Sequence, residues 1–303
     1  MTESKMNSDT HLDAIRAIVR GAYDLQRLRI QMGNRLVANL YSKLGVTPGE
    51  ALEEQEEETR NEIKDIKKSY ELIGTAAAND TNRINPKNFK GDALIASYTE
   101  FVLARGYFEL EKTEKKQFEA LGHALKEIPI YTEFLSKVRG VGPAMAGVII
   151  SEIDIHKARY VSSIYRYAGL DCGEDGKGRS KRKEHLVTVK YTDRDGKEAT
   201  RNSITFNPFL KTKLIGVLGS SFLRSGSPYA QVYKDYKFRL ENHATYKDTT
   251  KLHRHNMSMR YMIKMFLLDL YREWRKLEGL EVFVPYAEAK LGMAPHKGLE
   301  QAA

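Results

Sequence analysis

The chain has 303 residues, of which 41% are hydrophobic and 29% are charged, and its formal net charge is +9. This length suffices for one large domain or two modest ones, and the apolar content is enough to fill a core. No apolar run approaches the ~18 residues that a membrane span requires, and the polar N-terminus has no signal-peptide core. The single cysteine, Cys172, excludes intramolecular disulfides and a cysteine-rich zinc site, so we expect a reducing, cytoplasmic location.

Positive charge is concentrated in the second part of the chain. Residues 1–130 hold 19 Lys and Arg against 21 Asp and Glu, whereas residues 131–303 hold 30 against 19. A basic excess confined to one region favours a polyanionic partner such as nucleic acid. The alternative is a basic surface that serves solubility alone.

The first part of the chain has the apolar spacing of long helices. Apolar residues recur at intervals of three and four, with a polar loop over 75–91. This periodicity predicts helices over 10–44, 49–74 and 92–127.

These helices predict an arm over residues 1–130. Long helices joined by short loops are typical of an antiparallel bundle or coiled coil. We expect the chain to form a homo-oligomer through these helical arms. The acidic run from Glu53 to Glu58 is interpreted as a solvated helix face.

Residues 134–153 combine two apolar helical stretches with the turn Gly140-Val141-Gly142. Pro143 suits the first position of the second helix, where its missing N–H costs nothing. The free amides at that helix end suit a phosphate, and the preceding cations add charge. We predict a helix-hairpin-helix that holds a nucleic-acid backbone without reading bases. The predicted contacts are Lys137, Arg139, Gly140, Val141, Gly142, Pro143, Ala144 and Met145.

The same turn suggests two other interpretations. An ordinary helical hairpin with a glycine-rich turn is the alternative. A dinucleotide-binding turn is excluded, because that motif directly follows a β-strand and no strand pattern precedes these glycines.

A glycine-rich loop with five cations in seven residues follows over 173–183. So many like charges are costly to bring together without an anion, which predicts a phosphate-contacting loop; a solvated loop is the alternative. The cations are Lys177, Arg179, Lys181, Arg182 and Lys183.

Residues 186–206 change to the alternation of strands, with Asp195-Gly196 as the turn of a β-hairpin. Its basic residues allow it to lie along a nucleic-acid groove, or the ribbon covers the edge of its own domain.

The rest of the chain is predicted to be helical over 208–242 and 254–278, with a Met and aromatic stripe that belongs to the core. Residues 285–303 are predicted to be a flexible tail. The fold class is therefore mostly α. It has a helical arm over 1–130 and a helix-hairpin-helix domain over 131–284 that carries a small β-hairpin insertion.

Signals of catalysis are weak. Serine nucleophiles are conceivable at Ser180, Ser220, Ser221 and Ser225, but no nearby His or Asp pattern marks any of them as activated. The acidic spacing of a two-metal nuclease is not found. His253 and His255 lack an acidic or cysteine partner at metal-ligand spacing, so we predict no metal and no cofactor.

Several segments together resemble the C-terminal domain of IS110/IS116/IS902-type transposases. The resemblance is close over 134–171 and weaker further on, and about half of the chain is covered. The close segments are Val138 to Pro143, Ala146, Ile149, Glu152 to Ile155, Tyr160 to Ser163 and Tyr167 to Leu170. The weaker ones are Asn207 to Leu210, Tyr229 to Tyr236 and Met257 to Trp274.

The resemblance implies DNA binding and an origin in a mobile element. Members of the family carry a RuvC-like domain with four acidic metal ligands, whereas this chain starts in helices. They also carry a serine nucleophile shortly after the Ala-Gly-Leu turn. Residues 171–178 hold no serine, and Ser180 is the nearest one.

The leading hypothesis is a nucleoid-associated DNA-binding protein that acts in transposition or recombination. RNA or an RNA–DNA hybrid is also compatible with a backbone-binding hairpin. The first alternative is an active recombinase that uses Ser180 as its nucleophile. The second is a non-enzymatic oligomeric assembly protein.

Overall fold

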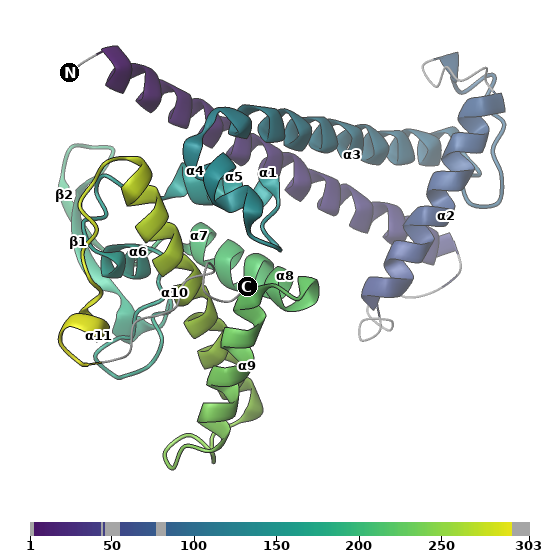
Figure 1. The fold of residues 1–303 in the computed structure, drawn as a ribbon. Helices are drawn as coiled ribbons and strands as arrows, with labels where there is room; N and C mark the ends of the chain where they lie inside the picture. The colour runs from purple at the N-terminus through teal and green to yellow at the C-terminus, as the bar shows by residue number, and fades with distance from the viewer. Residues whose placement is uncertain (1–2, 44, 46–54, 77–82, 293–303) are drawn as a thin grey trace. The chain divides into compact units, whose positions relative to one another are not determined.

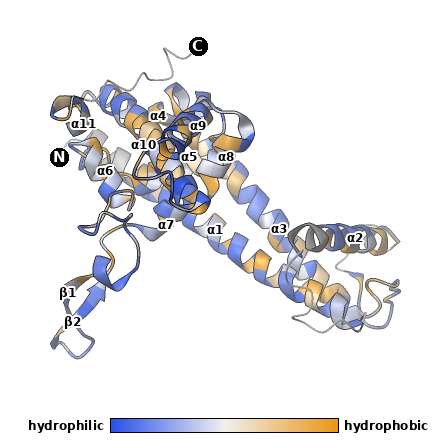
Figure 2. Ribbon diagram, turned by 90° about the horizontal axis from the view of Figure 1, so that it is seen from below, coloured by the Kyte–Doolittle hydropathy of each residue, from blue (hydrophilic) through white to orange (hydrophobic). Residues whose placement is uncertain are grey.

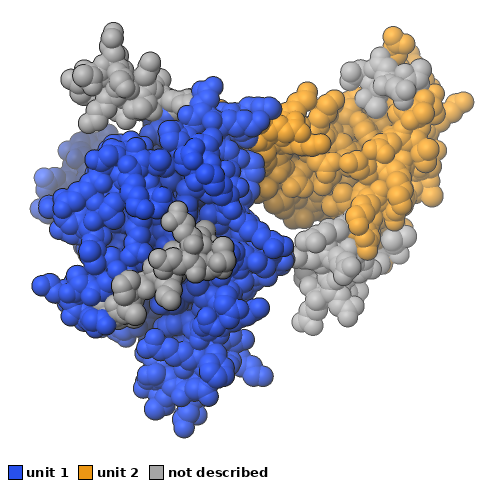
Figure 3. Space-filling view, in the orientation of Figure 1, with its two compact units in different colours: residues 1–16, 121–303 blue, residues 17–120 orange. Residues whose placement is uncertain are grey.

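The computed structural model describes residues 3–43, 45, 55–76 and 83–292, and within these ranges the chain is mostly helical with one two-stranded hairpin (Figure 1). The predicted fold class is confirmed. The chain divides into two compact units (Figure 3). Unit 1 comprises residues 1–16 and 121–303, and unit 2 comprises residues 17–120. Our predicted boundary lay ten residues further along, at 130/131.

Unit 2 is built from three helices. They are α1 (Glu3–Lys43) from residue 17 onward, α2 (Gln55–Ala76), and α3 (Tyr98–Ala124) up to residue 120. The predicted start of the second helix at residue 49, and the side chains of the acidic run from Glu53 to Glu58, lie outside what the structure describes.

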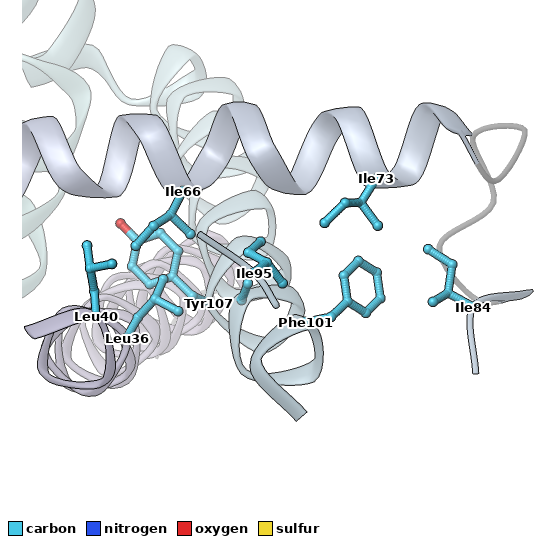
Figure 4. Close-up of a cluster of buried hydrophobic side chains, with 9 residues drawn as sticks. Leu36, Leu40, Ile66, Ile73, Ile84, Ile95, Phe101 and Tyr107 are labelled. Carbon is cyan, nitrogen blue, oxygen red and sulfur yellow. The ribbon is translucent and has the colours of Figure 1, made fainter. Parts of the chain in front are cut away.

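Helices α1 and α3 run antiparallel. Gln26 Nε2 donates to Glu114 Oε1 at 3.0 Å, and thirteen residues further along α1, Asn39 Nδ2 donates to Glu100 Oε1 at 3.0 Å. Buried apolar side chains from all three helices and the 83–97 segment form the core, as Figure 4 shows. The members of this core are Leu36, Leu40, Ile66, Ile73, Ile84, Ile95, Phe101, Ala104 and Tyr107.

Helix α3 begins at Tyr98, so the predicted start at residue 92 was wrong. Ser97 Oγ accepts the amide of Glu100, and Glu100 Oε2 accepts the amides of Ser97 and Ala96. This reciprocal capping box satisfies amides that the first turn of a helix leaves free. The side chain of Asp92 accepts the amides of Leu94 and Ile95, which keeps residues 92–95 in a turn.

Unit 1 is organised around the long helix α10 (Lys251–Leu277), which packs antiparallel to α9 (Pro228–Glu241). Met262 and Phe266 are fully buried, which confirms that the Met and aromatic stripe is core. Phe222 meets Phe266 edge to face at 5.3 Å, and Tyr229 donates a 2.9 Å hydrogen bond to Asp269.

Shorter helices surround α10 in unit 1. They are α4 (Pro129–Glu133), α5 (Pro143–Glu152), α6 (Val161–Tyr167), α7 (Pro208–Thr212), α8 (Gly219–Ser225) and α11 (Tyr286–Ala289). Between α7 and α8 the chain stays helical, but residues Lys213–Leu218 form the π-helix η5. Such wider turns are uncommon and accommodate an extra residue.

The helix predicted over 208–242 is interrupted between α8 and α9. Gly226 has a φ of +65°, in the left-handed region where a glycine ends a helix. The amide of Ser227 bonds back to the Phe222 carbonyl at 3.1 Å, and Pro228 opens the next helix. The continuous prediction was wrong because this cap outweighs an apolar periodicity that persists across it.

The C-terminal segment departs from the predicted tail over its first residues. Tyr286–Ala289 form α11, and Arg272 on α10 donates to Glu288 at 2.9 Å. Residues 293–303, the rest of the predicted tail, lie outside the described residues.

Candidate nucleic-acid interface

The turn that precedes α5 is anchored on α8 through Gly140. Its φ of +99° lies in the region that favours glycine. A Cβ here would lie 2.8 Å from Ser225 Oγ and 2.9 Å from Phe222 Cδ1, so a side chain has no room. The hydroxyl of Ser221 also donates to the Gly140 carbonyl at 2.8 Å. Gly140 therefore fixes the position of the turn within unit 1.

Gly142, two residues on, has open space in front of it. Its φ of −92° and ψ of 170° are extended backbone that any residue adopts, and a Cβ here would meet nothing within 4 Å. It is the N-cap of α5, yet no side chain caps this helix end. Ala146 is the first residue whose amide bonds back within the helix, to the Gly142 carbonyl at 3.0 Å. The amides of Ala144 and Met145 thus make the positive end of α5, which suits an anion.

The helix before the turn is shorter than the predicted first half of the hairpin. Helix α4 ends at Glu133, and Leu135–Lys137 form the 3₁₀ helix η3. The amide of Val138 bonds to the Leu135 carbonyl at 3.3 Å, three residues back. This tighter winding allows both Leu135 and Val138 to be buried.

The two cations at the turn are exposed. Lys137 pairs with Glu133 at 3.1 Å, but the two side chains are 65% and 59% exposed, and a pair of this kind contributes little. Among the described residues, none forms an ion pair or hydrogen bond with the Arg139 side chain. Both charges therefore remain accessible to solvent.

The five cations predicted in the 177–183 loop do not act alike. Arg179 is held by Asp171 Oδ2 through Nη2 at 2.7 Å and Nε at 3.1 Å, and it is largely buried. Arg182 Nη2 lies 3.4 Å from Asp175 Oδ2. The other three, Lys177, Lys181 and Lys183, are exposed. Two of the cations thus stabilise the loop, and three are presented to solvent.

Ser180 lies against the buried His185, so the expectation from the sequence that it lacks a nearby His or Asp partner was wrong. The side chain of His185 is 2% exposed, and its Nδ1 is 3.2 Å from Ser180 Oγ. Its Nε2 is 3.1 Å from Asp175 Oδ1. The backbone hydrogen bond from Lys177 and then the hydrogen bond to His185 lower the pKa of Asp175, which keeps this carboxylate charged. The three side chains are within ten residues of one another, so a Ser-His-Asp spacing was the available signal.

This arrangement has the order of a nucleophile, a base and an orienting carboxylate. The amide of Ser180 also donates to His185 Nδ1 at 2.9 Å, so the ring carries its proton on Nε2, facing Asp175. The hydroxyl and the amide of Ser180 therefore both point at the single lone pair of His185 Nδ1. In addition, Arg182 Nε donates to Ser180 Oγ at 3.0 Å. The same contacts close the loop and place a base beside the hydroxyl.

The β-hairpin consists of β1 (Val187–Thr192) and β2 (Glu198–Ser203) in antiparallel register, with Val187 opposite Ser203. It extends away from the helices of unit 1, as Figure 2 shows. Val187, Val189 and Tyr191 share one face and are about 40% exposed. The ribbon thus lies free of the rest of the unit, which leaves it available for a groove.

Among the described helices, none is long and apolar enough to cross a membrane. In the same part of the chain, no group of three or more His, Cys, Asp or Glu side chains is arranged to hold a metal ion. Comparison of the chain with models of known families, with curated proteins and with solved structures gives no match.

Proposed function

We propose that the protein binds the phosphate backbone of DNA through unit 1, at the uncapped N-terminus of α5. The observation that carries this proposal is the open space in front of Gly142, which lets a phosphate approach the amides of Ala144 and Met145. The exposed cations Lys137 and Arg139 stand at the same turn. Binding of this kind holds the backbone without reading bases.

The exposed lysines of the 177–183 loop extend the basic surface of unit 1. Because each phosphate contact releases counterions, we expect affinity to fall steeply with salt. The role in transposition or recombination of a mobile element follows from the resemblance to IS110-type transposases and is part of the proposal. The proposed place of action is the cytoplasm, in association with the nucleoid.

A mobility-shift experiment with a labelled duplex tests this function. Gly142→Asp puts a carboxylate at the N-cap, where it stabilises the helix but repels phosphate. We expect Gly142→Asp combined with Arg139→Ala to abolish the shift at moderate salt, and Gly142→Ala, which adds a methyl group in open space, to retain it. Unchanged binding by the charged double variant would overturn the proposal. An oligomer with no affinity for duplex DNA, RNA or a hybrid at low salt would favour the assembly protein instead.

A recombinase activity at Ser180 is the second candidate, and the contact between Ser180 Oγ and His185 Nδ1 favours it. In that reaction Oγ attacks a backbone phosphorus and forms an O–P bond. The bond from phosphorus to one ester oxygen breaks, His185 takes the serine proton, and the released oxygen is protonated. The product is a covalent protein–DNA adduct. The adduct should disappear in Ser180→Ala and persist in Ser220→Ala; absence of any adduct in the unmodified protein rejects this candidate.

A further inference from the structure

Three cations from two helices of unit 1 converge on one short loop. Lys211 belongs to α7, and Arg260 and Lys264 lie one turn apart on α10. None of them was singled out in the sequence, because Lys211 and Arg260 are 49 residues apart and only the fold brings them together.

The positions of the three charged groups are set by the loop 171–179 and its neighbours. The guanidinium of Arg260 occupies the space beside Gly178, where a Cβ would be 1.8 Å from Nη2. The ammonium of Lys211 donates to the Arg179 carbonyl and lies 4.8 Å from the centre of the Phe206 ring. The ammonium of Lys264 lies 5.2 Å from the centre of the Tyr165 ring.

These cations are partly withdrawn from water and repel one another. Burial is the largest cause that lowers the pKa of Lys211, and the charge of Arg260 lowers it further. Burial is the largest cause that lowers the pKa of Lys264; Cys172 acts in the opposite direction, and the charge of Arg260 lowers the pKa further. Of the carboxylates in the described chain, Asp171 alone counteracts these effects on both lysines.

Asp171 does not balance the cluster. Its Oδ2 is already engaged by Arg179. Its Oδ1 is buried and accepts no hydrogen bond from any described residue. Arg179 is also acted on by Asp175, whereas among the described carboxylates Asp171 alone offsets the charge of both lysines, and Arg179 already pairs with it. Partly buried charge in excess is unfavourable until an anion pairs with it.

We propose that Lys211, Arg260 and Lys264 form a binding site for a phosphoryl group. A guanidinium offers paired donors that match two phosphate oxygens, and the two ammonium groups supply point charges for the others. The phosphoryl group is a backbone phosphate of the bound nucleic acid, and this source rests on the proposed function. Because Lys211 bonds to the carbonyl of Arg179, the site adjoins Ser180 in the chain.

The test titrates the full-length protein with pyrophosphate and, separately, with a labelled duplex. We expect Lys264→Gln and Arg260→Gln to weaken pyrophosphate binding about tenfold, the loss of one charged hydrogen bond. Lys213→Gln is the matched control, because burial alone lowers the pKa of Lys213 and its ammonium lies 5.6 Å from the Phe209 ring. Lys213→Gln removes the same charge two residues further along the chain from Lys211, and this variant should bind pyrophosphate normally.

A second variant keeps the net charge. Gly178→Ala displaces the Arg260 guanidinium without removing it. We therefore expect weaker pyrophosphate binding although the net charge of the protein is unchanged. Melting temperatures measured in parallel verify folding, and loss of a repelled cation in Lys264→Gln should not lower them.

The outcomes separate the site from the proposed function. Equal pyrophosphate binding by all variants, or none by the unmodified protein at low salt, overturns the site. Weaker pyrophosphate binding in the cluster variants supports it. If the unmodified protein then binds no duplex, the nucleic-acid source is overturned and a free phosphoryl compound takes its place. If duplex binds and falls with the same variants but not with Lys213→Gln, both proposals stand.

Discussion

Ser180 and His185 meet across the loop that closes between α6 and β1, with Oγ 3.2 Å from Nδ1. The amide of Ser180 reaches the same nitrogen at 2.9 Å, so the backbone holds the ring whether or not the hydroxyl is present. The amide of Ser180 therefore contributes to the stability of the loop, whereas its hydroxyl is the group that the proposed reaction would use.

Loss of the His185 ring should therefore destabilise unit 1 far more than loss of the Ser180 hydroxyl. We expect His185→Ala to cost about 2 kcal/mol or more, since a buried ring and its hydrogen bonds are removed, and Ser180→Ala to cost about 1 kcal/mol or less. Urea unfolding of the two variants measures the difference. Gly173→Ala is an independent check, because its Cβ would lie 2.6 Å from His185 Nε2. Equal stability of the two single variants would contradict this role for His185.

The two glycines of the 140–142 turn should respond differently to alanine. Gly140→Ala introduces both an unfavourable φ of +99° and an overlap with Phe222, so we expect a loss of about 1–3 kcal/mol. Gly142→Ala enters open space and should cost about 1 kcal/mol or less, the preference of an N-cap for Gly over Ala. Denaturant midpoints with equal m-values provide the comparison. A Gly142→Ala loss as large as that of Gly140→Ala would show that the space in front of Gly142 is filled.

Unit 2 should weaken in acid through the turn that precedes α3. Burial alone would raise the pKa of Asp92, but hydrogen bonds from Ile95, Ser69 and Leu94 together lower it below the usual 3.8. For Glu100, burial acts in the same upward direction, and bonds led by that from Asn39 lower its pKa below 4.5.

The sign of the effect follows from these lowered values. A carboxylate whose pKa is lower in the folded state stabilises it above the unfolded pKa and loses that contribution as the pH falls through the folded pKa. Thermal melts between pH 7 and pH about 3 should show this loss, and Asp92→Asn should be less stable at pH 7 but less sensitive to acid. If the melting temperatures of Asp92→Asn and of the unmodified protein fall equally with pH, the loss of stability in acid does not come from Asp92.

The β-hairpin should be dispensable for folding. Its strands pair only with each other, and Val187 and Ser203 face each other at its base, so a short glycine linker can join residues 186 and 204. We expect the melting temperature to change by only a few degrees, because the strand residues bury little surface. If the ribbon lies in a groove, duplex affinity should fall in the same variant. Unfolding after this excision would mean that the hairpin supports the helices.

The sequence allowed the helices to be predicted but not where they stop. Apolar periodicity marks most of the buried face of α1 and α10, because burial of that face is what makes the pattern, but Leu28 and Ile30 of the predicted apolar pattern are 49% exposed. Helix ends depend on local caps that cut across the pattern, as the Ser97–Glu100 box and Gly226 do. The Ser-x-x-Glu spacing of the capping box and the Gly226 cap can both be read from the sequence. They were missed because the apolar periodicity continues across both positions.

The candidate site was predictable only where it is local. The start of α5 at Pro143 follows from proline chemistry at a helix N-terminus, as predicted. The contact of Ser180 with His185 depends on how the loop over residues 168–186 closes, and general loop-closure rules do not fix it. The approach of Lys211 to Arg260 depends on the tertiary arrangement of α7 and α10, which no spacing within the chain encodes.

The π-helix η5, Lys213–Leu218, lies between Lys211 of the proposed phosphoryl site and Ser221, which contacts the Gly140 turn. Its length in residues therefore fixes how these two side chains are oriented relative to each other. Each residue of an α-helix rotates the chain by about 100°, so the number of residues between two helical positions decides which faces they share. Lys211 precedes Lys213–Leu218, and Ser221, which holds the Gly140 turn, follows it. Removing one residue from this segment would rotate the lysine away from α10 while the serine stayed in place. Substitutions that preserve the length of η5 leave the rotation about the helix axis between Lys211 and Ser221 unchanged.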